Sequence, residues 1–191
     1  LSRKNEMKDW MIHTKKRIYP FDNSQYFLDL KVIDDTFNVL EEYKNIEPSH
    51  EGLVYWAGIR NGDKAIIKMV VAPSAESAEQ RITTTHKSNA QYVKLLAKHG
   101  YVHIAQVHSH PGAFIDHSPG DDEWTPFKRN GLISIVVASY GKYGMLPMNI
   151  CGVHKFIDQE FVRLNEEYID ERFHLSKEMN TLFEDLRDEK K

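Results

Sequence analysis

The chain has 191 residues, a formal net charge of −3 at pH 7, 41% hydrophobic residues and 28% charged residues. This length suits one domain of ordinary size, and the composition is typical of a globular chain rather than a disordered or membrane protein. Residues 1–17 are locally basic, but the net negative charge gives no general attraction to nucleic acid, and no apolar run reaches membrane-spanning length. We therefore expect neither nucleic acid nor a membrane among its partners.

The first predicted elements are a strand, a helix and a hairpin. Residues 26–33 have a strand pattern, and the apolar spacing over 36–44 predicts a helix capped by Asp34 or Asp35. Two further strand-like runs, 52–59 and 64–71, flank the turn residues Asn61-Gly62-Asp63 and predict a β-hairpin.

The middle of the chain is predicted to contain a loop, a helix and a strand. Residues 72–84 are small and polar, which favours a loop. The apolar spacing over 85–99, followed by Gly100, predicts a helix with a glycine stop. An apolar strand over 101–108 comes next.

The next elements are a short helix and two strands. Ser118 and Pro119 have the pattern of a helix cap and first helical residue, and Pro126 should kink or split this helix. The unbroken apolar run 132–139 predicts a buried strand, and Pro147 suggests that the strand over 145–154 lies at a sheet edge.

The C-terminal part has helical rather than strand-like spacing. Its apolar residues, spaced by threes, fours and one seven, are Phe161, Leu164, Tyr168, Leu175, Met179, Leu182 and Leu186. This spacing predicts an amphipathic helical tail that packs on the domain, on a partner or on a second copy. We expect an α+β fold with a mixed sheet flanked by helices, divided into an N-terminal extension (1–25), one domain (26–155) and a C-terminal helical extension (156–191).

Cysteine usage and the N-terminal sequence favour the cytoplasm. The single cysteine, Cys151, cannot form an internal disulfide, and the N-terminal residues lack the apolar core of a signal peptide. Cys151 lies in a strand-like segment, where we expect a buried and inert thiol.

The segment VHSHPGAFIDHSPGD, residues 107–121, carries the most informative pattern. His108 and His110 are two apart at the end of a strand, so both side chains project from one face and can hold one metal ion. Three protein ligands leave a coordination position for water, and zinc lowers the pKa of that water toward about 7. The expected chemistry is hydrolysis with one Zn²⁺ per chain.

Other polar residues near this pair leave alternatives open. Two histidines at this spacing also occur in protein cores, satisfied by hydrogen bonds. The strand period places His103 on the opposite face, so we expect it to be structural. Asp121, held by the first turn of a helix, is the favoured third ligand, with Asp122 as its rival. Asp116 and His117 are expected in a solvated loop tip, with His117 a candidate substrate contact.

Hydrolysis also needs a base, and Glu51 is the candidate because it opens the strand over 52–59. An exposed glutamate at a strand start would look the same in sequence, and Glu47 is the alternative. We expect the extended tail of a substrate to add as a strand near residues 51–58 and the loop 111–117.

The spacing His108-Ser-His110-Pro111, six residues, Ser118, two residues, Asp121 resembles H-[ST]-H-P-x6-S-x-x-D at every fixed position. This is the motif of the JAB/MPN-domain, or JAMM, metallopeptidases. The family also has an upstream E-x-x-G-x-x-x-G, in which Glu51 and Gly58 fit while Val54 replaces the first glycine. The similarity in element order covers residues 26–154.

The resemblance implies a cytidine-deaminase-like fold and a zinc isopeptidase that cleaves after the C-terminus of a ubiquitin-like protein. It implies zinc on His108, His110 and Asp121, general acid/base work by Glu51 and oxyanion stabilisation by Ser118. The compact form is similar to prokaryotic deconjugases, including those of bacterial antiphage systems. The alternatives are a catalytically silent scaffold that binds a ubiquitin-like protein or a partner subunit, and a zinc hydrolase acting on another peptide or a small molecule.

Overall fold

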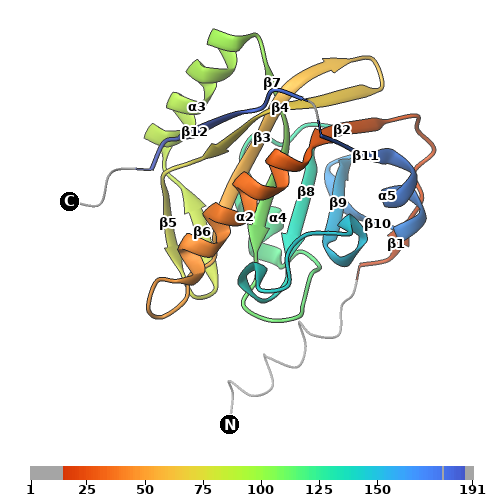
Figure 1. Ribbon diagram of the computed structural model, residues 1–191. Coiled ribbons are helices and arrows are strands. Elements are labelled where there is room, and N and C mark those ends of the chain that lie inside the picture. Colours follow the sequence, from red (N-terminus) through yellow and green to blue (C-terminus); the bar gives the residue numbers. More distant parts are fainter. Residues whose placement is uncertain (1–14, 178, 188–191) are drawn as a thin grey trace.

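The computed structural model, which describes residues 15–177 and 179–187, is built on a mixed ten-stranded sheet (Figure 1). The strand order is β1-β10-β9-β8-β7-β3-β4-β2-β11, and β12 pairs with part of β4. The strands of this sheet are β1 (Arg17–Ile18), β2 (Gln25–Asp29), β3 (Leu53–Asn61), β4 (Lys64–Ala72), β7 (Val102–Ser109), β8 (Ile133–Val137), β9 (Gly152–Ile157), β10 (Glu160–Leu164), β11 (Phe173–Ser176) and β12 (Leu182–Asp185). The helices are α2 (Leu30–Lys44), α3 (His86–His99), α4 (Pro119–Trp124) and α5 (Glu166–Arg172), with short 3₁₀ turns at Ser139–Gly141 and Met148–Ile150. The predicted α+β class is confirmed.

Two hydrophobic clusters cover the two faces of β3. Val54 and Trp56 lie in a large cluster with apolar residues of α2, which crosses in front of the sheet in Figure 1. Leu53 and Tyr55 lie in a second cluster that includes Tyr92 of α3. Because alternate residues of a strand face opposite sides, this second face is the one that also carries the histidines of β7.

The first helix begins earlier than predicted. Residues 30–33, predicted as strand, form the first turn of α2, and its cap is Asp29, whose side chain accepts a hydrogen bond from the Lys31 backbone N–H. A capped helix start satisfies backbone donors that a longer strand would leave unpaired, so β2 ends at the cap. The prediction of Asp34 or Asp35 as the cap is wrong.

The predicted hairpin and the second helix are confirmed. Strands β3 and β4 pair antiparallel around the turn at Gly62, and α3 ends at Gly100, whose φ of 65° is left-handed. Glycine adopts this conformation at little cost, which explains the stop.

Residues 72–84 are not simply a loop. They contain a second, two-stranded sheet formed by β5 (Ala75–Ala78) and β6 (Arg81–Thr84). Ile82 is the one large apolar side chain of these two strands that packs against the core, so their sequence lacks the alternation that identifies a strand. This hairpin stands beside the main sheet in Figure 1.

The prediction of a strand over 145–154 at a sheet edge is wrong in its bounds and in its place in the sheet. Strand β9 begins at Gly152 and pairs with β8 on one side and β10 on the other, so it is not an edge strand. Pro147 lies before it, in the irregular segment that precedes the 3₁₀ turn at Met148–Ile150, and so does not interrupt a ladder.

The predicted C-terminal helical tail is absent from the described residues. Phe161 and Leu164 belong to strand β10, and only Glu166–Arg172 is helical. Beyond α5 the chain pairs in parallel with β2 as β11 and with β4 as β12. Backbone pairing with the sheet outweighs the helical spacing of the apolar residues here. The described residues therefore do not form the C-terminal helix through which self-association was expected.

The predicted domain limits cut through this sheet. Lys155 and Phe156 are consecutive residues of β9, and strands on both sides of the limits at residues 25 and 156 belong to the same sheet. The basic residues of segment 1–14 lie outside the described residues. Among the described helices, none is long and apolar enough to span a membrane.

Candidate metal centre and active site

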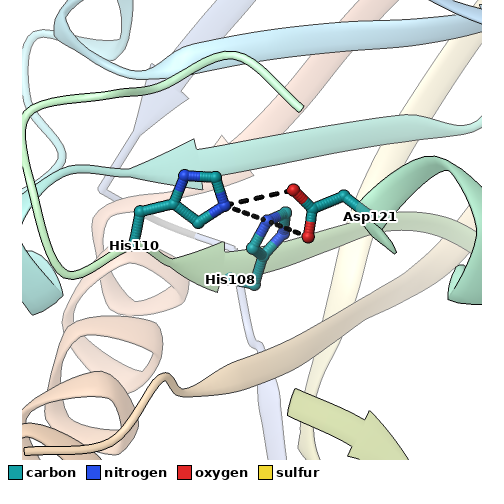
Figure 2. Close-up of side chains that lie close together, drawn as sticks. All are labelled: His108, His110 and Asp121. Atoms are coloured by element: carbon teal, nitrogen blue, oxygen red, sulfur yellow. Dashed lines mark hydrogen bonds and ion pairs between the residues drawn. The ribbon is translucent and has the colours of Figure 1, made fainter. Parts of the chain in front are cut away.

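His108, His110 and Asp121 converge at one point (Figure 2). The two Nε2 atoms are 3.2 Å apart, and each lies 3.2 Å from an oxygen of Asp121. In a tetrahedral zinc site with bonds of about 2.0–2.1 Å, neighbouring ligand atoms are about 3.3 Å apart. The three donors therefore have the spacing of one face of such a tetrahedron.

Local structure orients each of these side chains. Strand β7 carries His108 and ends at Ser109, and His110 follows directly with its Nε2 3.2 Å from that of His108. The Nδ1 of His110 lies 2.9 Å from the carbonyl oxygen of Phe114, to which it donates. This bond leaves Nε2 of His110 with the lone pair that a metal needs.

Asp121 is fixed by the capping box of α4. Its Oδ2 accepts from the Ser118 backbone N–H at 2.7 Å, while the Ser118 hydroxyl accepts from the Asp121 N–H at 3.2 Å. The predicted helix start, with Ser118 as cap and Pro119 as first residue, is confirmed, and α4 ends before Pro126.

The charges of the three side chains are complementary. Burial disfavours the carboxylate of Asp121, but His108 and His110 outweigh it and hold the pKa of Asp121 well below its usual range. Burial alone would lower the pKa of His110, whereas Asp121 and Glu51 raise it above its usual value. These interactions favour a charged carboxylate on Asp121 next to the two imidazoles.

Glu51 lies beside the histidines. Glu51 lies two residues before Leu53, which pairs with His108, and its carboxyl group interacts electrostatically with His110. Its side chain is 5% exposed, so it is not an ordinary surface glutamate. Burial, with a smaller contribution from Asp121, raises the pKa of Glu51 to about 8. A nearby cation would favour its carboxylate form.

Val54, which differs from the glycine of the motif that the sequence resembles, does not touch the site. Val54 is paired with Val107 and is buried in the cluster under α2, on the face opposite Glu51. Gly58, by contrast, has a steric role, because a Cβ there would lie 1.9 Å from the carbonyl oxygen of Ile66.

Asp122 turns away from the three donors. Its Oδ1 lies 2.8 Å from Nδ1 of His117, and both carboxylate oxygens bind the ammonium of Lys15. The structure thus brings Asp121, and not its rival, together with the histidines.

The loop residues Asp116 and His117 are buried, which contradicts their predicted place in a solvated loop tip. Asp116 accepts from Arg163 of β10 at 2.6 Å, and His117 lies between Asp122 and Ser134 of β8. Strands β8 and β10 provide these distant polar partners, which local sequence does not reveal.

Two other side chains with reactive groups, His103 and Cys151, are buried and have structural roles. His103 lies on the face of Tyr55 and not on the opposite one, because a bulge between β3 and β7 shifts the register there. Its Nδ1 lies 2.7 Å from the Tyr92 hydroxyl, and burial lowers its pKa to about 3. Burial raises the pKa of Cys151 to about 12, as expected for an inert thiol.

The loop 111–117, which follows the histidine pair, approaches β9 closely at Gly152. A Cβ on Gly152 would lie 1.6 Å from the carbonyl oxygen of Ile115, so only glycine lets the loop reach β9. In sequence this glycine is not distinguishable from others, because its partner is 37 residues away by number (152 − 115).

Gly152→Ala is therefore expected to lower the free energy of unfolding by at least about 2 kcal/mol and to weaken metal binding, because the loop must move. Gly112→Ala is the matched control, since a Cβ at Gly112 meets nothing within 4 Å. Denaturant unfolding and metal titration measure both effects, and an equally stable Gly152→Ala protein would contradict the steric argument.

A pocket opens beside the three donors. It is lined by residues of β3, β6, β7, α4 and the segment after α4: Leu53, Ile82, Thr83, Thr84, Gln106, His108, Gly120, Asp121, Trp124, Thr125 and Pro126. The contribution of β6 to this pocket was not predicted, because residues 72–84 were expected to form a loop.

Residues 55–58 of β3 pair with β4 on one side and with β7 on the other, so a substrate strand cannot add directly to them. Docking of a substrate tail near residues 51–58 and the loop 111–117 stays a prediction. Strand β6, whose residues line the pocket, pairs within its sheet with β5 alone among the described residues.

Comparisons with known proteins agree with this site in general terms. No family model matches the chain. The chain is 29% identical over 108 residues to "Probable metalloprotease y4jG" of Sinorhizobium fredii. This match covers 50% of the chain and 61% of the relative, so it spans less than two thirds of that protein.

The fold resembles that of a solved bacterial protein. The solution structure of protein DSY2949 from Desulfitobacterium hafniense matches with a TM-score of 0.60 and 16% identity. The match covers 81% of this chain and 95% of the other. Together, the metalloprotease relative and the His-His-Asp group support a metal-dependent hydrolase.

Proposed function

We propose that the protein is a JAMM-type zinc isopeptidase that cleaves the bond after the C-terminal tail of a ubiquitin-like protein. The observation that carries the proposal is the convergence of His108, His110 and Asp121 opposite a buried Glu51, beside a pocket. Zinc is the proposed ion because two imidazoles and a carboxylate, with one position left for water, are a common catalytic zinc set.

Bound zinc would supply Lewis-acid activation of water and of the scissile carbonyl. The role of Glu51 is to take a proton from the attacking water and return it to the leaving amine. Its burial beside His110 supports this role, because a carboxyl group held away from bulk water transfers a proton only to groups inside the site.

Ser118 can act as cap and as oxyanion donor at once. A serine hydroxyl has one hydrogen and two acceptor lone pairs, and the bond from the Asp121 N–H uses only a lone pair. The hydroxyl hydrogen of Ser118 therefore remains for the oxyanion that forms at the scissile carbonyl. One such donor contributes about 3–4 kcal/mol to the transition state.

An extended tail is proposed to lie along the free edge of β6. Ile82, Thr83 and Thr84 of this strand share the pocket with His108 and Asp121, so a strand added there would lead to the metal centre. The family resemblance supports a cytoplasmic enzyme of a bacterial antiphage conjugation system as its setting.

The test is cleavage of a panel of bacterial ubiquitin-like proteins, each fused through its C-terminal glycine to a short peptide. We expect one or more fusions to be cut, cutting to stop on chelation, and zinc to restore it. Replacing the penultimate glycine of a cut fusion with tryptophan should abolish cleavage. An uncut panel with zinc-loaded protein would contradict the proposed substrate class.

A further inference from the structure

Two buried polar atoms in the pocket lack hydrogen-bond partners within the described parts of the chain. They are Oε1 of Gln106 and Oγ1 of Thr83, and both residues line the pocket with His108 and Asp121. Gln106 is only 4% exposed. Buried polar groups are rarely left unpaired, because desolvation costs free energy that a hydrogen bond would offset.

The hydrogen bonds of Thr125 fix the orientation of the Gln106 amide. The Thr125 hydroxyl donates its one hydrogen to the carbonyl oxygen of Asp121, so it can only accept from Gln106. The Gln106 atom that lies 2.8 Å from it must therefore be Nε2, which also donates to Ser134 at 3.1 Å. Oε1 of Gln106 is left as an acceptor of fixed direction.

A peptide group carries one donor and one acceptor, which are the partners that these two atoms lack. A trans peptide presents its N–H and its C=O on opposite edges, and the two unpaired atoms belong to different elements, β7 and β6. Gln106 Oε1 can accept the N–H, while the Thr83 hydroxyl can donate to the C=O. The apolar side chains of Leu53, Ile82 and Trp124 in the same pocket would exclude water and strengthen these bonds.

We propose that Gln106 and Thr83 determine specificity by binding the substrate peptide group next to the scissile carbonyl. This inference rests on the proposed function, because it concerns the substrate of the same metal centre. Gln106 and Thr83 would form hydrogen bonds with the backbone N–H and C=O of the substrate. These bonds need no substrate side chain, so they are compatible with a glycine tail.

Two small probes test this without cleavage of any protein. N-acetylglycine carries a carboxylate for the metal and an amide N–H one bond from the methylene carbon, whereas acetoxyacetate has an ester oxygen in place of that N–H. In zinc-loaded wild-type protein we expect N-acetylglycine to bind about tenfold or more tightly, as sites with a buried acceptor reject analogues that lack the donor. NMR titration measures both dissociation constants.

Gln106→Met keeps the size of the side chain and removes the acceptor, so the preference for N-acetylglycine should vanish. Thr83→Val should weaken both probes by about threefold to tenfold, because both contain the carbonyl that the hydroxyl would bind. Thr83→Ser is the control, since it keeps the hydroxyl and should bind as wild type does. Thr83→Val should unfold no earlier than wild type, because the Thr83 hydroxyl has no hydrogen-bond partner among residues 15–177 and 179–187.

Equal binding of the two probes by wild type, or binding of neither, would overturn the proposal, as would a preference that persists in Gln106→Met. If Gln106→Met fails to fold, the Thr83 pair decides: wild-type affinity in Thr83→Val overturns the proposal and selective loss supports it. Failure of the proposed function is recognised separately, because the fusion panel would stay uncut while the probes are still distinguished.

Discussion

Glu51→Gln is expected to lower the turnover of a cleavable ubiquitin-like fusion by roughly 100-fold or more while leaving zinc content unchanged. The amide has the shape of the carboxyl group but cannot carry a proton between water and the leaving amine. His108, His110 and Asp121 are untouched by the change, so metal and substrate should still bind. Single-turnover cleavage, elemental analysis and a binding titration measure the three quantities.

Glu47→Gln is the matched control, because Glu47 is exposed in the turn after α2 and should not affect turnover. A Glu51→Gln protein that cuts as fast as wild type would show that the base is another group. A wild type that binds a ubiquitin-like protein without cutting it, and that Glu51→Gln leaves unchanged, would favour the scaffold alternative.

The parts of the site that lie in one segment were predictable from the sequence. The end of β7 and the cap of α4 both follow from local patterns: strand alternation before His110, and the Ser118-Pro119 helix start. Local patterns predict these ligands because the strand end and the helix cap that orient them lie in the same short segment of sequence. Glu51 became the candidate base through the family resemblance rather than its position alone, and the structure buries it near His110.

The parts that depend on distant contacts were not predictable. His117 looked like a solvated loop residue because its partner Ser134 comes from β8, and Gly152 owes its importance to Ile115. The hairpin β5–β6 was missed because Ile82 is its one large apolar side chain packed on the core, and a single such residue gives no alternation. Its position beside the metal centre follows from tertiary packing that no local pattern encodes.

The C-terminal segment shows a second limit of local patterns. Apolar residues three and four apart fit a helix, but Leu175, Leu182 and Phe183 are exposed and their strands are held by backbone pairing with β2 and β4. A segment can pair with a sheet edge whatever the spacing of its apolar side chains, because the unpaired N–H and C=O groups of the edge strand gain hydrogen-bond partners.

Asp121→Asn is expected to reduce zinc from one ion per chain to a small fraction, with metal affinity lowered by about 100-fold or more. The asparagine oxygen can still accept from the Ser118 N–H, so the start of α4 should stay in place. What is lost is the negative charge that offsets the cation. Elemental analysis after dialysis and zinc titration measure the change, and cleavage should fall in proportion to bound metal.

Asp122→Asn is the matched control, because Asp122 lies in the same helical turn but binds Lys15 and His117 and does not face the histidines. It should retain one zinc per chain. Full zinc occupancy in Asp121→Asn together with loss in Asp122→Asn would reverse the assignment of the third ligand.

The same residues predict that chelation removes activity without unfolding the protein. Protein contacts hold two of the ligands independently of a cation, because His110 donates to the Phe114 carbonyl oxygen and Asp121 accepts from the Ser118 N–H. Zinc at 100 times its dissociation constant would add only about 2.7 kcal/mol to the free energy of unfolding. Circular dichroism with and without chelator checks this: an intact fold with no cleavage, restored by zinc, is expected. Loss of the fold on chelation would mean that the ion is structural rather than catalytic.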